Sequence, residues 1–211
     1  MYKVNILDNI VAHKFGVQMN KKILTIIMLI TLPIIIFADV NNGWTPLHDA
    51  IYNGNTKKIT KLITKDSVTK ESKAGVTPLH LAVKMRQLGT VQKLIDAGAD
   101  IDAQDKSGQT ALHYALAQRL NKIAKILIKK DADMDLGNNS GITPLHQAAY
   151  KGDTDMVQYM IDNGATVDVK NKQGTTPCQL SFIKQNMSTT SLLQQYTKLP
   201  CGIKSLKKGV K

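Results

Sequence analysis

The sequence has little cysteine, few aromatic residues and almost no arginine. Its 2 cysteines in 211 residues exclude a disulfide-rich scaffold and a four-cysteine zinc module. Aromatic residues make up only 5%, but the hydrophobic content of 43% is too high for a disordered chain. Of the 28 basic residues, 26 are Lys. Because Arg is preferred for bidentate contacts, this composition argues against bidentate recognition of phosphate or guanine.

The positive charge is unevenly distributed along the chain. Residues 1–38 carry four Lys and one acid, and the chain from Ser181 onward carries six Lys and no acid. Residues 39–180 contain 18 basic and 15 acidic residues, so they are nearly balanced. The basic character therefore belongs mainly to the leader and the tail.

An apolar segment near the N-terminus bears on the compartment. Met19 is followed by two Lys, the apolar run Ile23–Phe37 and then Ala38, as in a secretory signal peptide. The run is shorter than the ~20 residues of a spanning helix and contains Pro33, although Ile36 is not the small residue that a cleavage site prefers. Residues 19–38 are therefore predicted to be a cleaved signal peptide. The alternatives are an uncleaved membrane anchor and a buried core helix.

Both of the first two interpretations place residues 39–211 outside the cytoplasm, either in a periplasm or secreted. The chain then starts at Met1 or at Met19. Residues 1–18 are either a long positively charged region of the signal or an upstream extension that is not translated, which we favour.

The body of the chain repeats one motif five times, at intervals of 32 or 33 residues. The motif is Gly-x-Thr-Pro-Leu-His, with substitutions in the third and fifth copies. Thr suits the residue that caps a helix, and Pro suits the first helical position, where no N–H donor is needed. Because a single turn–helix–helix unit cannot bury its apolar face, neighbouring units must stack. The motif residues are Thr45, His48, Thr77, His80, Thr110, His113, Thr143 and His146, followed by the decayed copy Thr176–Gln179.

These units resemble ankyrin repeats over roughly residues 40–197. The resemblance implies an all-α repeat solenoid of stacked helix-turn-helix units, with short β-hairpin or loop fingers at right angles to the stack. The predicted array covers residues 39–197, followed by a basic tail at 198–211. Its repeats are predicted at about 41–72, 73–105, 106–138, 139–171 and 172–197.

The turn between the two helices departs from the family pattern. Gly54 and Gly152 keep the glycine that the family usually has there, whereas Arg86, Arg119 and Gln185 replace it. A non-glycine residue in the left-handed conformation costs about 1–2 kcal/mol. We therefore expect either local strain or a different turn in repeats two and three.

The ends of the second helices also vary. Asp66 and Asp131 replace the terminal glycine of repeats one and three, which is a milder change because Asp tolerates the left-handed region. The second stretch of the fifth unit, Ser188–Gln195, is polar apart from two leucines. We expect it to serve as a C-terminal cap, because a terminal repeat shows a polar face to water.

The sequence shows no constellation that could carry chemistry. Four of the five histidines occupy one repeat position, which indicates structural hydrogen bonding, and at about 10 Å spacing they could not share a metal ion. The acidic cluster Asp96, Asp100, Asp102 and Asp105 lacks the closing Glu of a calcium loop. We therefore predict a protein that is not an enzyme and has no cofactor, no metal ion and no small-molecule substrate.

The expected function is protein–protein interaction by a monomeric array. The resemblance implies contacts from the finger tips, the residue before each motif Thr, and the end of each first helix. Six residues at these positions are Lys and none is acidic, and the single Trp and two Tyr lie among them. We therefore predict a partner with an acidic surface, because Trp and Tyr are enriched at binding hot spots and Lys steers encounter. The predicted contact residues are Trp44, Tyr52, Lys73, Val76, Lys84, Met85, Lys106, Gln109, Ile142, Tyr150, Lys151, Lys172 and Lys184.

The alternative function is nucleic-acid or anionic-membrane binding through the Lys-rich tail. A solvated, disordered tail is the simpler interpretation. Nucleic acid is disfavoured as a partner, and a membrane is expected only if the leader stays uncleaved.

The two cysteines allow two interpretations. Cys178 replaces the buried Leu of the fifth motif, and Cys201 lies just beyond the fifth unit. They are either a small buried hydrophobic residue and an exposed thiol, or a disulfide that closes a loop of ~24 residues and adds about 3 kcal/mol. An oxidising compartment favours the disulfide.

Overall fold

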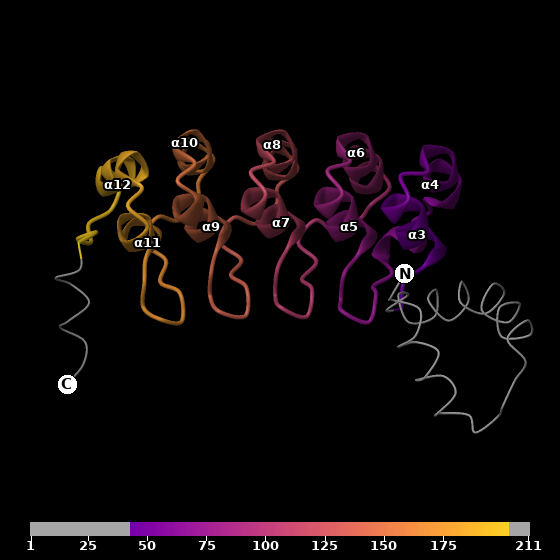
Figure 1. Ribbon diagram of the computed structural model, residues 1–211, viewed down its shortest axis with the longest axis horizontal. Helices are drawn as coiled ribbons and strands as arrows, with labels where there is room; N and C mark the ends of the chain where they lie inside the picture. Colours follow the sequence, from indigo (N-terminus) through magenta and orange to yellow (C-terminus); the bar gives the residue numbers. More distant parts are fainter. Residues whose placement is uncertain (1–42, 203–211) are drawn as a thin grey trace, which may run out of the picture. The chain divides into compact units, whose positions relative to one another are not determined.

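The computed structural model describes residues 43–202, so the predicted signal peptide and most of the basic tail lie outside the described residues. In the described range the chain forms five helix pairs (Figure 1). No strand occurs between residues 43 and 202, and the solenoid is all-α as predicted. The pairs are α3 (Pro46–Tyr52) with α4 (Thr56–Leu62), α5 (Pro78–Lys84) with α6 (Leu88–Asp96), α7 (Ala111–Ala117) with α8 (Asn121–Lys129), α9 (Pro144–Lys151) with α10 (Thr154–Asp162), and α11 (Pro177–Ile183) with α12 (Met187–Gln194).

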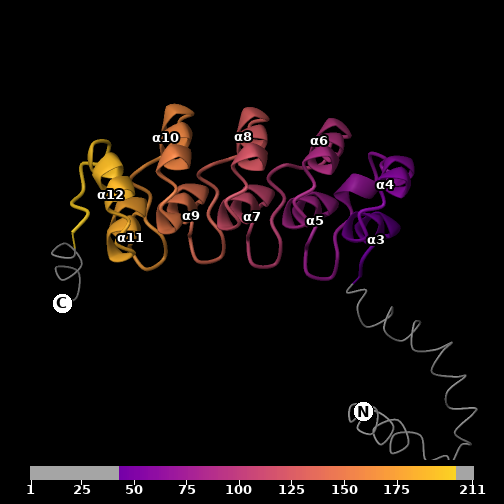
Figure 2. The same ribbon diagram turned by 45° about the horizontal axis from the view of Figure 1, so that its top comes forward.

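The helices form two layers. The first helices of the pairs lie in one row, the second helices lie in a row beside them, and the finger loops project from the side of the first helices (Figures 1 and 2). The first helices bury small residues such as Ala82, Ala115 and Ala148, which lets neighbouring helices approach closely. Larger residues such as Leu79, Leu112 and Leu145 are also fully buried. The result is one continuous core along the stack.

Each first helix starts with a reciprocal capping arrangement. The Thr143 hydroxyl accepts a hydrogen bond from the backbone N–H of His146, and the His146 ring in turn accepts one from the N–H of Thr143. The same pair of bonds occurs in all five repeats, with Gln179 in place of His in the fifth. Two of the otherwise unpaired N–H groups at each helix start are thereby satisfied.

The inter-helix turns adopt the left-handed conformation even where glycine is missing. Arg86, Arg119 and Gln185 have φ angles of 58°, 55° and 60°, close to the 64° and 68° of Gly54 and Gly152. The alternative of a different turn is therefore wrong. Arg119 donates a hydrogen bond to the backbone oxygen of Lys151, and Arg86 Nε donates one to Gln118 Oε1 at 3.3 Å.

The second helices end in two different ways. Asp131 has a φ of 63°, so its left-handed conformation is confirmed. The equivalent expectation for Asp66 is wrong, since its φ is −75° and it precedes a short 3₁₀ helix, Ser67–Thr69. The Ser67 hydroxyl explains the difference, because it donates to the backbone oxygen of Leu62 at 2.7 Å and so satisfies a carbonyl at the end of α4.

The finger loops are linked to one another by backbone hydrogen bonds. The N–H groups of Lys106, Asn139 and Lys172 each donate to the carbonyl of a residue in the preceding finger at 3.0 Å. Within a finger, one side chain at the base accepts two backbone N–H groups. Asn138 Oδ1, for example, accepts from Ser140 at 2.9 Å and from Ile142 at 3.1 Å. The fingers therefore form a connected row rather than independent loops.

The two ends of the described stack expose polar residues. In α12 Leu193 is fully buried, whereas Ser188, Ser191 and Gln194 are exposed, as expected of a cap. At the other end Lys58 is exposed at a position where the later repeats bury Thr90, Ile123, Met156 and Thr189. Both ends thus follow the requirement that an outer repeat face be compatible with water.

Candidate partner-binding face

The motif histidines connect each repeat to the next. Because the N–H of Thr77 donates to His80 Nδ1 at 3.2 Å, the ring proton lies on Nε2, which donates to the Gln109 carbonyl at 2.8 Å. Burial lowers the pKa of all four rings, and the backbone hydrogen bond offsets part of this effect. The carbonyls that accept these bonds belong to the residues preceding the next motif Thr, which are Val76, Gln109, Ile142 and Thr175.

The histidine bonds therefore fix the residues that were predicted to contact a partner. Val76, Gln109 and Ile142 each have their backbone held by the ring of the preceding repeat, while their side chains remain partly exposed. The histidines themselves are 0–1% exposed. They shape the face without being accessible to a ligand.

The acidic cluster around Asp102 serves the backbone. Asp102 Oδ1 accepts the N–H of Asp133 in the next repeat at 2.9 Å, and burial raises the pKa of this carboxyl. Asp105 Oδ1 accepts the N–H groups of Ser107 and Gln109 at the base of a finger. Among residues 43–202 no three His, Cys, Asp or Glu side chains are grouped to hold a metal ion. The same residues include no helix long and apolar enough to cross a membrane.

The predicted contact residues lie on the first helices and fingers, and all are at least partly accessible. Tyr52 and Tyr150 are 54% and 41% exposed, which is unusual for large aromatic side chains. The lysines of the fingers and helix ends are exposed, except for Lys151, which is half-buried. Trp44, Met85 and the residues before the motif Thr are also half-buried. We call these thirteen residues the partner-binding face.

Aromatic side chains gather at two places on this face. In repeat one the ring centroids of Trp44 and Tyr52 are 5.2 Å apart, and Trp44 stacks on His48 at 6.2 Å. At the second place, the Lys184 ammonium of repeat five lies 4.6 Å from the centroid of the Tyr150 ring of repeat four. A cation held this way over an aromatic ring is stabilised by about 0.5–1 kcal/mol at an exposed site.

The second of these places borders a cleft between repeats four and five. Its volume is about 400 Å³, and Ile142, Tyr150 and Leu180 supply apolar walls while Gln147, Asn171, Gln173 and Thr175 supply polar groups. Such a mixture is typical of a small binding pocket. Sequence reasoning included Ile142 and Tyr150 but missed Gln147 and Leu180. Gln147 lies three residues before Tyr150, so helical spacing could have found it.

In other repeats, the position equivalent to Gln147 is occupied by an acid and by a third tyrosine. Asp49 occupies that position in repeat one, and Tyr114 occupies it in repeat three. The Tyr114 hydroxyl donates to Asp105 Oδ2 at 2.8 Å, and burial with this carboxylate raises the pKa of Tyr114. The face is therefore predominantly basic, with Asp49 as an acid that the sequence analysis overlooked.

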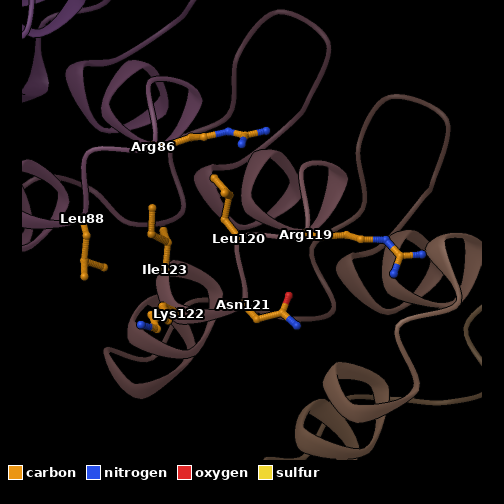
Figure 3. Close-up of a pocket in the computed structure, with 7 residues that line it drawn as sticks. All are labelled: Arg86, Leu88, Arg119, Leu120, Asn121, Lys122 and Ile123. Carbon is orange, nitrogen blue, oxygen red and sulfur yellow. The ribbon is translucent and has the colours of Figure 1, made fainter.

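A second cleft lies at the inter-helix turns of repeats two and three. It has a volume of about 390 Å³, and Leu88, Leu120 and Ile123 provide apolar lining (Figure 3). Figure 3 shows that the side chains of Arg86 and Arg119 point the same way, away from Leu88 and Lys122. Both guanidinium groups instead bond to the following repeat. The two arginines therefore do not converge to form an anion site in this cleft.

Comparison with known sequences decides the family. The model for ankyrin repeats (3 copies) matches residues 17–105 and 120–199. The chain belongs to the ankyrin repeat family. Ankyrin repeats indicate a protein–protein interaction module, and the family is generally a non-enzymatic scaffold.

Several curated proteins resemble parts of the array. Delta-latroinsectotoxin-Lt1a of Latrodectus tredecimguttatus is 36% identical over 64 residues, 29% of this chain and 5% of the toxin. Human ankyrin repeat and SOCS box protein 3 is 36% identical over 67 residues, 30% of this chain and 13% of that protein. The probable 26S proteasome regulatory subunit p28 of Saccharomyces cerevisiae is 37% identical over 68 residues, 31% of this chain and 30% of p28. The matched segment thus spans less than a third of each relative.

Proposed function

We propose that the array binds an acidic protein surface or acidic peptide through the partner-binding face. The observation that carries this proposal is that Tyr150 lines the cleft between repeats four and five and that the Lys184 ammonium lies over its ring. The exposed ring provides apolar area, and the ammonium above it provides a positive charge beside the cleft. A carboxylate next to an apolar side chain would satisfy both groups.

The charge distribution across the repeat supports the same partner class. The six lysines of the face come from four different repeats, whereas Asp100, Asp133 and Asp135 lie in the loops that follow the second helices. Several of those carboxylates already accept backbone N–H groups. We infer that Trp44, Tyr52 and Tyr150 supply most of the binding energy, while the lysines accelerate encounter.

We further propose that the array works as an exported monomer, either periplasmic or secreted. The disulfide between Cys178 and Cys201 supports an oxidising compartment, since such bonds are rare in cytosolic proteins. The proposal includes no small-molecule substrate and no cofactor. The basic tail is the alternative site, for nucleic acid or an anionic membrane. Its Lys198 is exposed, and residues 203–211 lie outside the described range.

The test is a kinetic comparison on a partner identified by photo-cross-linking from position 150. Lys84→Glu combined with Lys151→Glu should slow association by an order of magnitude or more at low ionic strength, because steering depends on charge. Tyr150→Ala should leave association nearly unchanged and speed dissociation. The matched control is Lys57→Glu with Lys61→Glu on α4, which makes the same charge change on the other helix layer. An association rate that responds equally to both pairs, or to neither, contradicts the proposed face.

A further inference from the structure

A second basic surface lies on the row of second helices. Its members are exposed lysines on α4, α6 and α8, and helices α4 and α8 contain no acid. We call it the outer basic surface, and it consists of Lys57, Lys61, Lys93, Lys122, Lys125 and Lys129. In Figure 1 these three helices lie in the row opposite the fingers, so this surface is separate from the partner-binding face.

The positive charge of this surface ends abruptly at repeat four. Asp155 and Asp162 of α10 stand 33 residues after Lys122 and Lys129, at the same places on the helix. Since the positions are equivalent and equally solvent-facing, the fold does not require either charge there. Asp96 of α6 stands at the Lys129 position in repeat two, so the patch consists mainly of lysines from α4 and α8 and does not extend to α10.

The fold makes little use of these lysines. The ion pairs among the described residues are Lys70–Asp66 at 3.1 Å and Lys130–Asp96 at 3.6 Å, and neither includes a member of the patch. Lys93 Nζ bonds to the Thr60 hydroxyl at 3.0 Å, and Lys125 Nζ lies 4.7 Å from the centroid of the Tyr159 ring. Both of these partners are neutral. Asp96 of α6 is the one acid on these three helices and pairs with Lys130, so most of the charge of the patch is uncompensated by the protein.

We propose that the outer basic surface docks the array onto an anionic phospholipid bilayer. Helices α4 and α8 present most of the charge, with Lys93 of α6 between them, and Lys attracts headgroups as a point charge without demanding a fixed phosphate geometry. The two arginines, which would suit fixed phosphate contacts, bond to neighbouring repeats instead.

The sequence before the array favours a bilayer over nucleic acid as the occupant. The apolar run Ile23–Phe37 ends six residues before Gly43. If residues 19–38 remain as an uncleaved membrane anchor, which is the alternative to the cleaved signal peptide, six extended residues would hold the array within about 20 Å of the bilayer. Docking through the second helices leaves the first helices and fingers facing away from the lipid, free to bind a partner.

The experiment measures flotation of the full chain with phosphatidylcholine vesicles and with vesicles that contain phosphatidylglycerol. The ratio of the two partition coefficients isolates the electrostatic preference, because any insertion of the apolar run contributes to both. The outer variant carries Lys57→Gln, Lys93→Gln, Lys122→Gln and Lys129→Gln. Its matched control carries Lys73→Gln, Lys106→Gln, Lys172→Gln and Lys184→Gln, with the same loss of charge on the other side.

The outer variant should lose about fivefold in this ratio per lysine, or several hundredfold in total, and the control should lose far less. A third variant, Asp155→Lys with Asp162→Lys, extends the patch and should raise the ratio. Circular dichroism verifies that each variant is folded. Equal losses in the outer variant and its control, or a wild-type ratio near one, would overturn the proposal. So would an outer variant that loses affinity for duplex DNA but keeps its preference for anionic vesicles.

Discussion

At the residue scale, the inter-helix turn shows how one interaction can offset an unfavourable backbone conformation. Arg86 and Arg119 are left-handed, which glycine would adopt more easily. The two guanidinium groups bond to residues at the C-terminal ends of α7 and α9, where a helix attracts positive charge. The strain expected from the sequence is therefore present, but the structure adds a compensating contact that only the neighbouring repeat reveals.

Replacing these residues with glycine should separate the cost of the left-handed backbone conformation from the stabilisation that the side-chain hydrogen bond provides. Gln185→Gly and Arg86→Gly should each raise the free energy of unfolding by about 1 kcal/mol, because the backbone cost is removed and the Arg86 bond is long and exposed. Arg119→Gly should gain less, since it loses a hydrogen bond to a backbone carbonyl. Urea unfolding measures all three. As the reverse control, Gly54→Ala should lower stability, although a Cβ there meets no neighbouring atom within 4 Å. Equal gains at Arg86 and Arg119 would show that the Lys151 contact contributes nothing.

The four motif histidines predict a stability that depends on pH. Because burial lowers each folded-state pKa below 6.5, the unfolded chain binds more protons than the folded one as the pH falls below this value. Their contribution to stability is fully present above pH ~6.5 and is lost as the pH falls towards the folded-state pKa values. Urea unfolding at pH 7.5, 6.0 and 5.0 should therefore show decreasing stability.

A variant at one histidine tests this assignment. Gln179 makes the equivalent bond to the N–H of Thr176 in repeat five without a titratable ring. His113→Gln should therefore keep much of the stability at pH 7.5 and reduce the pH dependence between 7.5 and 5.0. An unchanged pH dependence would mean that other groups cause it.

At the element scale, the features that sequence could predict are those that local residues determine. Thr143, Pro144 and His146 lie within four residues of one another, so the helix start could be read directly from the motif. The left-handed Asp131 could be expected for the same reason, whereas the different end of α4 depends on the hydroxyl of Ser67, five residues beyond Leu62. The family pattern placed the accessible face, but not its cleft.

The features that sequence missed arise between repeats. The cleft beside Tyr150 combines α9, α11 and the fingers of repeats four and five, and its shape depends on how these two repeats stack. Leu180 belongs to the following repeat, so no pattern within repeat four could place it there. The row of finger-to-finger hydrogen bonds likewise involves backbone groups, which leave no signal in the side-chain pattern.

The finger bases predict a measurable contribution to stability. Asn138→Ala leaves the N–H groups of Ser140 and Ile142 without their acceptor, and the second of these is partly buried. The free energy of unfolding should fall by about 1–2 kcal/mol. Asn138→Asp should retain most of it, because Asp105 makes the same two bonds in the preceding finger. Denaturant melts provide the measurement, and an alanine variant as stable as the aspartate variant would contradict this account.

At the scale of the whole molecule, the array is a chain of nearest-neighbour contacts. Carboxylates 33 residues apart, Asp102, Asp135 and Asp168, each accept hydrogen bonds from the following unit. The last of these holds Thr197 and Lys198, and the disulfide between Cys178 and Cys201 ties the same segment to the fifth repeat. Because each repeat contacts only its neighbours, a change at one end should weaken mainly that end.

The disulfide provides the test of this local coupling. Its Cα atoms are 5.2 Å apart and it joins residues 23 positions apart, so opening it should lower the free energy of unfolding of the fifth repeat by about 3 kcal/mol. Hydrogen exchange before and after reduction should show lost protection in α11 and α12, a smaller loss in α9 and α10, and no change in α3 to α6. Cys201→Ser should reproduce the pattern without a reductant. Thiol titration of the denatured, non-reduced protein should find no free thiol, and two thiols per chain would contradict the bond. Protection lost evenly along the array would show instead that the five repeats unfold as one unit, because the disulfide would then stabilise distant repeats as much as its own.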